Sequence, residues 1–164
     1  MIETTYTVKQ NITYAPSVSQ WPSTSFIDSS GSTIITRTAQ DDEASATLNF
    51  TLPSTAGTGA VGIFGSMGRV HGNYLVSLSE ISPSAAEIVQ DQGHSSLYNH
   101  AIVHEQMLFY QDGLTPGGSY SLKVTNKPNS AGMNEFGLEY IRTWSLGTGT
   151  AAIAPAPPSS SSPT

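Results

Sequence analysis

The chain of 164 residues contains no cysteine and few charged side chains. Without thiols it cannot form a disulfide framework or a thiolate metal site. Lysine and arginine number only 6, against 12 aspartate and glutamate residues, and the net charge is -6. A chain with so few cations offers no basic stripe to neutralise phosphates. We therefore expect it to bind neither nucleic acid nor an anionic membrane surface.

Long apolar runs and helical periodicity are also scarce. No stretch approaches the roughly 18 consecutive apolar residues of a membrane-spanning helix, and the polar residues 1–5 lack the apolar segment of a signal peptide. We expect membrane attachment only through an anchor that this chain does not contain. Helical alternatives exist for residues 101–110 and for a short turn at residues 83–90.

Strict alternation of apolar and polar residues, in contrast, is frequent. The clearest case is residues 44–52, and residues 74–78 and 120–125 repeat the pattern between Gly, Pro or Asn turns. Less regular β-like runs cover residues 4–14, 33–38, 60–64, 102–110 and 138–144. About eight short strands predict an all-β fold, namely an antiparallel β-sandwich of the jelly-roll type. The side chains expected to be buried are Leu48, Phe50, Ile63, Tyr74, Val76, Leu78, Leu108, Leu122, Val124 and Tyr140.

The end of the chain differs in composition from the rest. Residues 148–164 are rich in Ala, Pro, Ser and Thr and show no apolar periodicity. We expect a single β-sandwich domain over residues 1–147 and a disordered Pro/Ser-rich linker over residues 148–164, of the kind found in O-glycosylated stalks. Asn11 and Asn49 each begin an N-glycosylation sequon. Together these features favour an extracellular or cell-surface protein.

Three short motifs resemble cofactor or catalytic signatures but lack the context that those sites require. Residues 57–62 match the spacing G-x-G-x-x-G of dinucleotide sites, but no helix follows them, and a flexible strand connection is expected. Ser66 resembles the serine of a nucleophile elbow, G-x-S-x-G, but that motif requires glycine at position 64, where this chain has Phe64. The acidic residues 41–43 favour a solvated turn over a calcium site or an acid/base pair. We expect neither a cofactor nor a catalytic residue.

One group of side chains resembles a metal site. It combines His94, His100 and His104 with Glu105. On a helix, His100 and His104 would share a face and could chelate zinc. On the strand that we favour, four residues extend over roughly 13 Å, too far for one ion. The pattern therefore indicates histidines in solvated loops or on the sheet surface, and no metal.

Several segments, taken in order, resemble one family. They are residues 11–14 with Trp21, then 44–51, 59–65, 71–78, 106–109, 113–126 and 138–141. They resemble the galactose-binding-like β-sandwich ectodomains of basidiomycete fungal surface proteins, which are related in fold to jelly-roll carbohydrate-binding modules. The resemblance implies a Ser/Thr/Pro linker that leads to a membrane span. It also makes Glu139 a calcium candidate, although Lys9 and Gln10 stand where family members often carry acidic residues.

The sequence constrains the binding partner less than it constrains the fold, because ligands of this fold range from sugars to proteins and lipids. We interpret the chain as a non-catalytic carbohydrate-binding module whose loops stack aromatic rings on a sugar and hydrogen-bond its hydroxyls. The loop residues expected to do so are Trp21, Arg69, His71, Tyr98 and Asn99. Alternatively, Trp21 fills the core and Arg69 solubilises a turn, and the chain is an adhesive or structural ectodomain that binds a cell-surface protein. A jelly-roll hydrolase would need a perturbed titratable group beside a second catalytic group.

Overall fold

The computed structural model of the chain describes residues 1–54, 56–81, 87–97, 101–127 and 135–147. These residues form eleven strands and one short 3₁₀-helix, η1 (Val18–Gln20). The strands are β1 (Ile2–Thr7), β2 (Ile12–Ala15), β3 (Ser23–Ile27), β4 (Thr33–Ala39), β5 (Ser45–Thr51), β6 (Ala56–Met67), β7 (Asn73–Glu80), β8 (Glu87–Ser95), β9 (Val103–Leu114), β10 (Ser119–Lys127) and β11 (Phe136–Gly147). No helix among the described residues has the length and hydropathy needed to cross a membrane.

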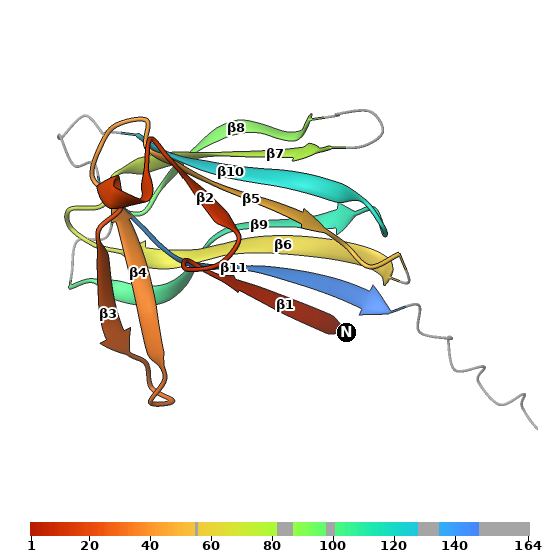
Figure 1. Ribbon diagram of the computed structural model, residues 1–164, viewed down its shortest axis with the longest axis horizontal. Coiled ribbons are helices and arrows are strands. Elements are labelled where there is room, and N and C mark those ends of the chain that lie inside the picture. Colours follow the sequence, from red (N-terminus) through yellow and green to blue (C-terminus); the bar gives the residue numbers. More distant parts are fainter. Residues whose placement is uncertain (55, 82–86, 98–100, 128–134, 148–164) are drawn as a thin grey trace, which may run out of the picture.

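The strands pair in two antiparallel sheets, which Figure 1 shows as two layers. The six-stranded sheet has the order β3-β4-β11-β6-β9, and β1 also pairs with β11. The five-stranded sheet has the order β2-β5-β10-β7-β8. At one end the hairpin β3–β4 extends away from the sandwich (Figure 1). The predicted all-β antiparallel sandwich is confirmed.

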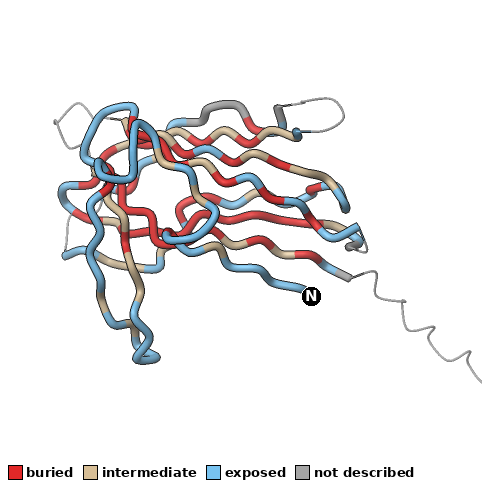
Figure 2. The backbone as a smooth tube through the Cα atoms, viewed as in Figure 1, coloured by how far each residue is buried: buried red, intermediate tan, exposed pale blue. Residues whose placement is uncertain are grey.

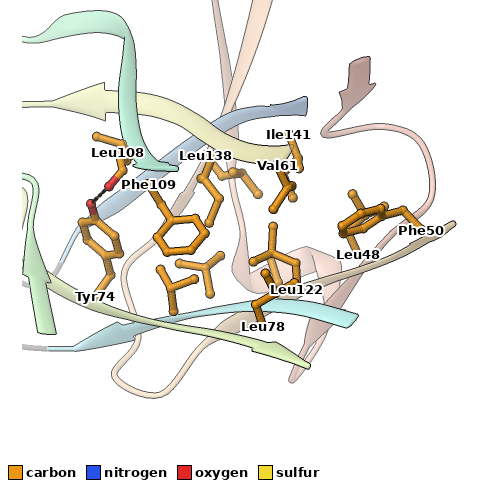
Figure 3. Close-up of a cluster of buried hydrophobic side chains, with 14 of the residues drawn as sticks. Leu48, Phe50, Val61, Tyr74, Leu78, Leu108, Phe109, Leu122, Leu138 and Ile141 are labelled. Carbon is orange, nitrogen blue, oxygen red and sulfur yellow. Dashed lines mark hydrogen bonds between the residues drawn. The ribbon is translucent and has the colours of Figure 1, made fainter. Parts of the chain in front are cut away.

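The core lies between the two sheets, because alternate residues of each strand point inward. In β5, Leu48 and Phe50 are buried while Asn49 between them is exposed. Figure 2 shows buried and exposed residues alternating in the same way along other strands. In the close-up of Figure 3, side chains of the two sheets meet, and the hydroxyl of Tyr74 donates a hydrogen bond of 2.5 Å to the carbonyl oxygen of Leu108.

The alternation also predicts which side chains are buried. Each residue of the predicted set has at most 8% of its surface exposed, so that prediction is confirmed. The set is Leu48, Phe50, Ile63, Tyr74, Val76, Leu78, Leu108, Leu122, Val124 and Tyr140. Tyr140 has different surroundings from the others, because its ring stacks on Phe64 at 4.7 Å outside the main core cluster.

The strand boundaries differ from the sequence-based expectation in several places. Residues 4–14 contribute to two strands, because a turn at Asn11, whose φ is 59°, separates β1 from β2. The pattern also misses β3 and β8, which form because β4 and β7 supply their backbone hydrogen bonds. Residues 57–62 lie inside β6 and pair with both β11 and β9, so the prediction of a flexible connection there is wrong.

Both helical alternatives are overturned where the structure describes the chain. Residues 103–110 lie in β9 and residues 87–90 lie in β8. Residues 83–86 lie outside the described part. So does the expected linker over residues 148–164, which remains a prediction.

Candidate functional site

Trp21, the first of the predicted sugar-binding residues, is completely buried. Its ring packs against Tyr14 with 5.1 Å between the ring centroids. The indole N–H donates a hydrogen bond of 3.4 Å to the carbonyl oxygen of Ala15. The alternative reading, in which Trp21 fills the core, therefore replaces the expectation that its ring stacks on a sugar.

The other predicted ligand residues are scattered or buried. Arg69 is exposed in the loop after β6, whereas His71 in the same loop is only 2% exposed. Tyr98 and Asn99 lie outside the described residues. The structure thus does not bring these residues together on one exposed surface within the part of the chain that it describes.

An aromatic cluster instead covers the outer face of the six-stranded sheet. We call it the aromatic face, and it consists of Phe64 from β6, Tyr110 from β9, and Tyr140 and Trp144 from β11. The ring centroids of Tyr110 and Trp144 lie 5.9 Å apart, and those of Trp144 and Phe64 lie 6.2 Å apart. The ring centroids of Phe64 and Tyr140 lie 4.7 Å apart. Neighbouring strands thus place the four rings in one continuous row.

The alternation of β11 explains why its aromatic side chains point outward. Ile141 belongs to the core cluster, and Tyr140, Arg142 and Trp144 alternate with the inward-facing residues of this strand. The guanidinium of Arg142 lies over the ring of Phe64 at 5.5 Å and over that of Tyr140 at 5.1 Å. Burial raises the pKa of the Tyr140 hydroxyl, while Arg142 opposes the shift. The row of rings therefore ends in two hydrogen-bond donors, a cation and a neutral phenol.

Contacts on two sides hold the Trp144 ring in place. Its indole N–H donates a hydrogen bond of 3.0 Å to Oε2 of Glu3 in β1, and Oε1 of Glu3 lies 3.2 Å from Nε of Arg142. Gly62 leaves room for the ring, because a Cβ atom there would lie 3.0 Å from Cη2 of Trp144. The ring is oriented before any ligand binds, which lowers the entropic cost of binding.

Two hollows adjoin the aromatic face. The first has a volume of about 510 Å³, and its lining includes Met107, Tyr110, Asp112, Trp144 and Leu146. Met107, Tyr110 and Leu146 each expose about half of their surface. The second, of about 370 Å³, lies between β1, the hairpin β3–β4 and β11, and its lining includes Thr5, Asp28, Glu105, Glu139, Tyr140 and Arg142. The exposed ring of Tyr110 and the partly exposed ring of Trp144 lie beside hollows with polar groups, which is typical of ligand sites.

Glu139, the calcium candidate, is buried and bonded to protein donors. Its Oε1 accepts a hydrogen bond of 3.2 Å from the Thr36 hydroxyl and lies 2.6 Å from Nδ1 of His104. Its Oε2 accepts a bond of 2.6 Å from the backbone N–H of Glu105, which adopts a left-handed φ of 55°. No group of three or more metal-ligating side chains occurs among the described residues. Both carboxylate oxygens of Glu139 are thus bonded to protein donors, and calcium binding at this residue stays a prediction.

Ser66 and His71 form a buried pair that resembles a nucleophile and its base. Oγ of Ser66 lies 2.9 Å from Nε2 of His71. Burial, together with the nearby His104, lowers the pKa of His71 to about 4, and its Nδ1 has no hydrogen-bond partner among the described residues. An efficient base needs a pKa near the working pH and a group that orients it. The pair therefore gives the hydrolase alternative no support.

The remaining histidines of the metal-like group have structural contacts. His94 stacks on Tyr74 at 5.2 Å, and burial lowers its pKa. His104 stacks on Phe26 at 3.7 Å and is bonded to Glu139. The prediction is wrong for His94, whose Nε2 is buried, whereas His104 lies on β9 with 30% of its side chain exposed, as expected of a sheet-surface histidine. His100 lies outside the described residues.

The acidic turn and the sequons are exposed. Residues 41–43 form an exposed turn between β4 and β5 in which Glu43 pairs with Lys127, so the prediction of a solvated turn is confirmed. Asn49 lies on the outer face of the five-stranded sheet, and Asn11 lies in the turn before β2. Both side chains are accessible, and their glycosylation stays a prediction.

No protein-family model and no curated protein sequence matches the chain. Its fold is similar to the CBM36-1 domain of a multidomain xylanase from the hindgut metagenome of Trinervitermes trinervoides, with a TM-score of 0.51 and 7% sequence identity, over 89% of this chain and 99% of that one. It is also similar to a family 35 carbohydrate binding module from Clostridium thermocellum, with a TM-score of 0.45 and 10% identity, over 89% and 100% of the two chains. A third similar structure is the module CBM6cm-2 from Cellvibrio mixtus lichenase 5A, with a TM-score of 0.45 and 10% identity, over 87% and 97%.

The first of these structures, with a TM-score of 0.51, shows the fold. The chain has the jelly-roll β-sandwich fold of carbohydrate-binding modules, as the sequence predicts. At 7% identity the likeness concerns the fold alone, and the ligand has to be argued from the chain's own surface.

Proposed function

We propose that this chain is a non-catalytic carbohydrate-binding module and that the aromatic face carries its sugar site. The observation that carries this proposal is the pair of Tyr110 and Trp144, whose rings lie 5.9 Å apart on the outer face of the sheet. Tyr110 exposes 50% of its surface there. Large rings on a water-facing sheet surface are costly unless a partner covers them, so they mark a binding surface.

The chemistry of this face suits a sugar. A pyranose ring has apolar C–H faces that stack on aromatic rings, and hydroxyl groups around its edge that need donors and acceptors. Tyr110 and Trp144 supply the stacking surface. Asp112 lines the same hollow and accepts hydrogen bonds, and Arg142 lines the adjoining hollow and donates them. The fold similarity to carbohydrate-binding modules supports the same proposal.

An adhesive ectodomain is the second candidate, because apolar side chains flank the aromatic face. Met107 is 54% and Leu146 is 51% exposed, and both line the hollow beside Trp144. A protein partner would cover such a surface as readily as a glycan would. We further propose a secreted or surface location, which rests on the two accessible sequons and the composition of residues 148–164.

A glycan array followed by calorimetric titration with the best glycan tests the sugar site. Trp144→Ala should weaken binding by about 1 to 3 kcal/mol, the loss expected for a central aromatic anchor. Ile81→Ala is the matched control, because Ile81 is 49% exposed and directly follows β7 of the other sheet. Bound glycan should also change the fluorescence of Trp144, whereas the fluorescence of the buried Trp21 should stay unchanged. A protein that binds no glycan on the array, or that binds equally well after Trp144→Ala, would favour the adhesive reading.

A further inference from the structure

Glu3 of β1 contacts two members of the candidate site at once. Its Oε2 accepts a hydrogen bond of 3.0 Å from the indole N–H of Trp144, and its Oε1 lies 3.2 Å from Nε of Arg142. The carboxylate therefore bridges the ring that would stack on a sugar and the cation beside the row of rings. Such a group can act on the site in two ways, by holding the ring and by balancing the charge.

The pairing of β1 with β11 explains why Glu3 reaches both side chains. Glu3 lies directly opposite Trp144, and Thr5 lies directly opposite Arg142. Tyr6 packs against the core cluster, so the residues that alternate with it point to the outer face. Directly opposite residues share a face and lie close enough for their side chains to interact. The Thr5 hydroxyl accordingly accepts a second bond, of 3.3 Å, from Nε of Arg142.

The bond to Glu3 fixes the orientation of the Trp144 ring. The ring also neighbours Gly62, Phe64 and Tyr110. These apolar contacts are less directional than a hydrogen bond, so they specify the orientation less strictly. A ring that is already held does not have to be immobilised when a ligand binds. Loss of the acceptor should therefore weaken the binding of any sugar that stacks on Trp144, whatever its charge.

Charge at the aromatic face adds a second role. Asp112 lines the hollow beside Trp144, and Glu3 contacts the ring itself, so a negatively charged sugar would meet two carboxylates. Arg142 would attract such a sugar, but the charge of Glu3 balances its own. Bringing like charges together is costly, and binding sites use this cost to reject the wrong ligand. The arrangement therefore disfavours sugars that carry a carboxylate or sulfate group.

The ion pair between Glu3 and Arg142 lies at the surface. The side chain of Arg142 is 30% exposed and that of Glu3 is 42% exposed. Exposed ion pairs contribute little to the stability of a fold. A substitution at Glu3 should therefore change binding while the domain stays folded, which distinguishes a role in the site from a structural role.

We propose that Glu3 is the positioning and specificity-determining residue of the aromatic face. It holds Trp144 ready to stack on a sugar, and it disfavours acidic sugars by balancing the charge of Arg142. The inference rests on the proposed carbohydrate-binding function and adds to it how the site selects among sugars. Alanine at this position removes both roles. Glutamine keeps an acceptor for the indole N–H but removes the charge, so the two substitutions separate positioning from selection.

Calorimetric titration with two probes tests the proposal. One probe is the neutral glycan that binds most tightly on the array, and the other is the same glycan with one C6 hydroxymethyl group oxidised to a carboxylate. The unmodified protein should bind the acidic form at least about tenfold more weakly. Glu3→Ala should weaken binding of the neutral form about three- to tenfold, because the ring is then ordered only on binding.

Glu3→Gln should recover most of that loss and reduce the difference between the two forms at least about threefold. Any contact that oxidation of C6 removes is missing in both proteins, so the change in this difference reports the charge of residue 3. Glu80→Gln is the matched control. It removes the same charge at the end of β7 in the other sheet, and it should change neither the affinity nor the difference.

The positioning role has a readout that needs no ligand. In a two-dimensional nitrogen–proton NMR spectrum of the free protein, each of the two tryptophans gives one indole signal, and Trp144→Ala identifies the signal of Trp144. Glu3→Ala should shift this signal and speed the exchange of its proton with water, and Glu3→Gln should restore most of both. The signal of the buried Trp21 should not move.

The outcomes separate the two roles of Glu3 from the proposed function. An unchanged Trp144 signal in Glu3→Ala refutes the positioning role. An undiminished difference between the two glycan forms in Glu3→Gln, or an acidic glycan as the tightest binder on the array, refutes the selection role. In both cases the proposed function stands if Trp144→Ala weakens binding. If no glycan binds, the proposed function fails and the selection role fails with it, while the NMR comparison still decides the positioning role.

Discussion

Replacing Phe50 by Ala tests whether the sandwich core is packed as described. Phe50 is 5% exposed, and its ring stacks on Tyr120 with 5.4 Å between the ring centroids. Tyr120 faces Phe50 directly across the β5–β10 pair, so the backbone prevents it from closing the cavity. Truncation of such a ring costs about 3 to 5 kcal/mol, which is the lost transfer free energy plus the cavity term. A domain of this size has a total stability of about 5 to 15 kcal/mol, so the loss is large.

Urea denaturation followed by the fluorescence of the buried Trp21 and by circular dichroism measures this loss. The midpoint should fall while the slope m stays constant, because the variant removes packing without changing the surface exposed on unfolding. The melting temperature should fall by about 6 to 20 °C, from about 2 to 4 °C per kcal/mol. Asn49→Ala, one residue away on the exposed face of β5, is the control and should change stability by no more than about 0.5 kcal/mol.

The outcome that refutes the reasoning is a loss below about 1 kcal/mol for Phe50→Ala, or equal losses for the two variants. Either result would mean that β5 does not present alternate faces to core and solvent. The register of β5 with β10 would then be shifted by one residue, since such a shift exchanges the two faces.

Two further predictions concern the end of the chain and the response to acid. Deleting residues 148–164 should leave the melting temperature unchanged within error, because the segment has no apolar periodicity with which to pack; a drop of more than a few degrees in a thermal scan would show that it docks. The folded-state pKa of His71, about 4, lies below its ordinary value of 6.5, so the unfolded chain takes up the proton first as the pH falls. Its contribution to stability is therefore complete above pH 6.5 and declines between 6.5 and about 4. Urea titrations at both ends of this window should show a smaller decline for His71→Gln, and an identical decline would contradict the buried neutral imidazole.

The local alternation of apolar and polar residues was sufficient to predict the class of fold and most of the core. Residues 44–52 alternate so regularly that only one face of β5 can be apolar, and the predicted buried set follows from such alternation. It was insufficient for β3 and β8, whose sequences carry no clear alternation and which form because a neighbouring strand completes their hydrogen bonds. Cooperative pairing of this kind leaves little trace in the segment itself.

The candidate site depended on tertiary structure. Alternation within residues 138–144 already indicates that Tyr140, Arg142 and Trp144 share a face. It cannot say that Tyr110 arrives beside Trp144 from β9, because β6 lies between the two strands and the register of both pairings decides the contact. For the same reason Trp21 could be assigned to a loop from its neighbours but not to the surface, since its burial depends on the packing of Tyr14 and other side chains around it. Sequence thus determined which residues alternate, and the sheet pairings decided which rings meet and which of them face the solvent.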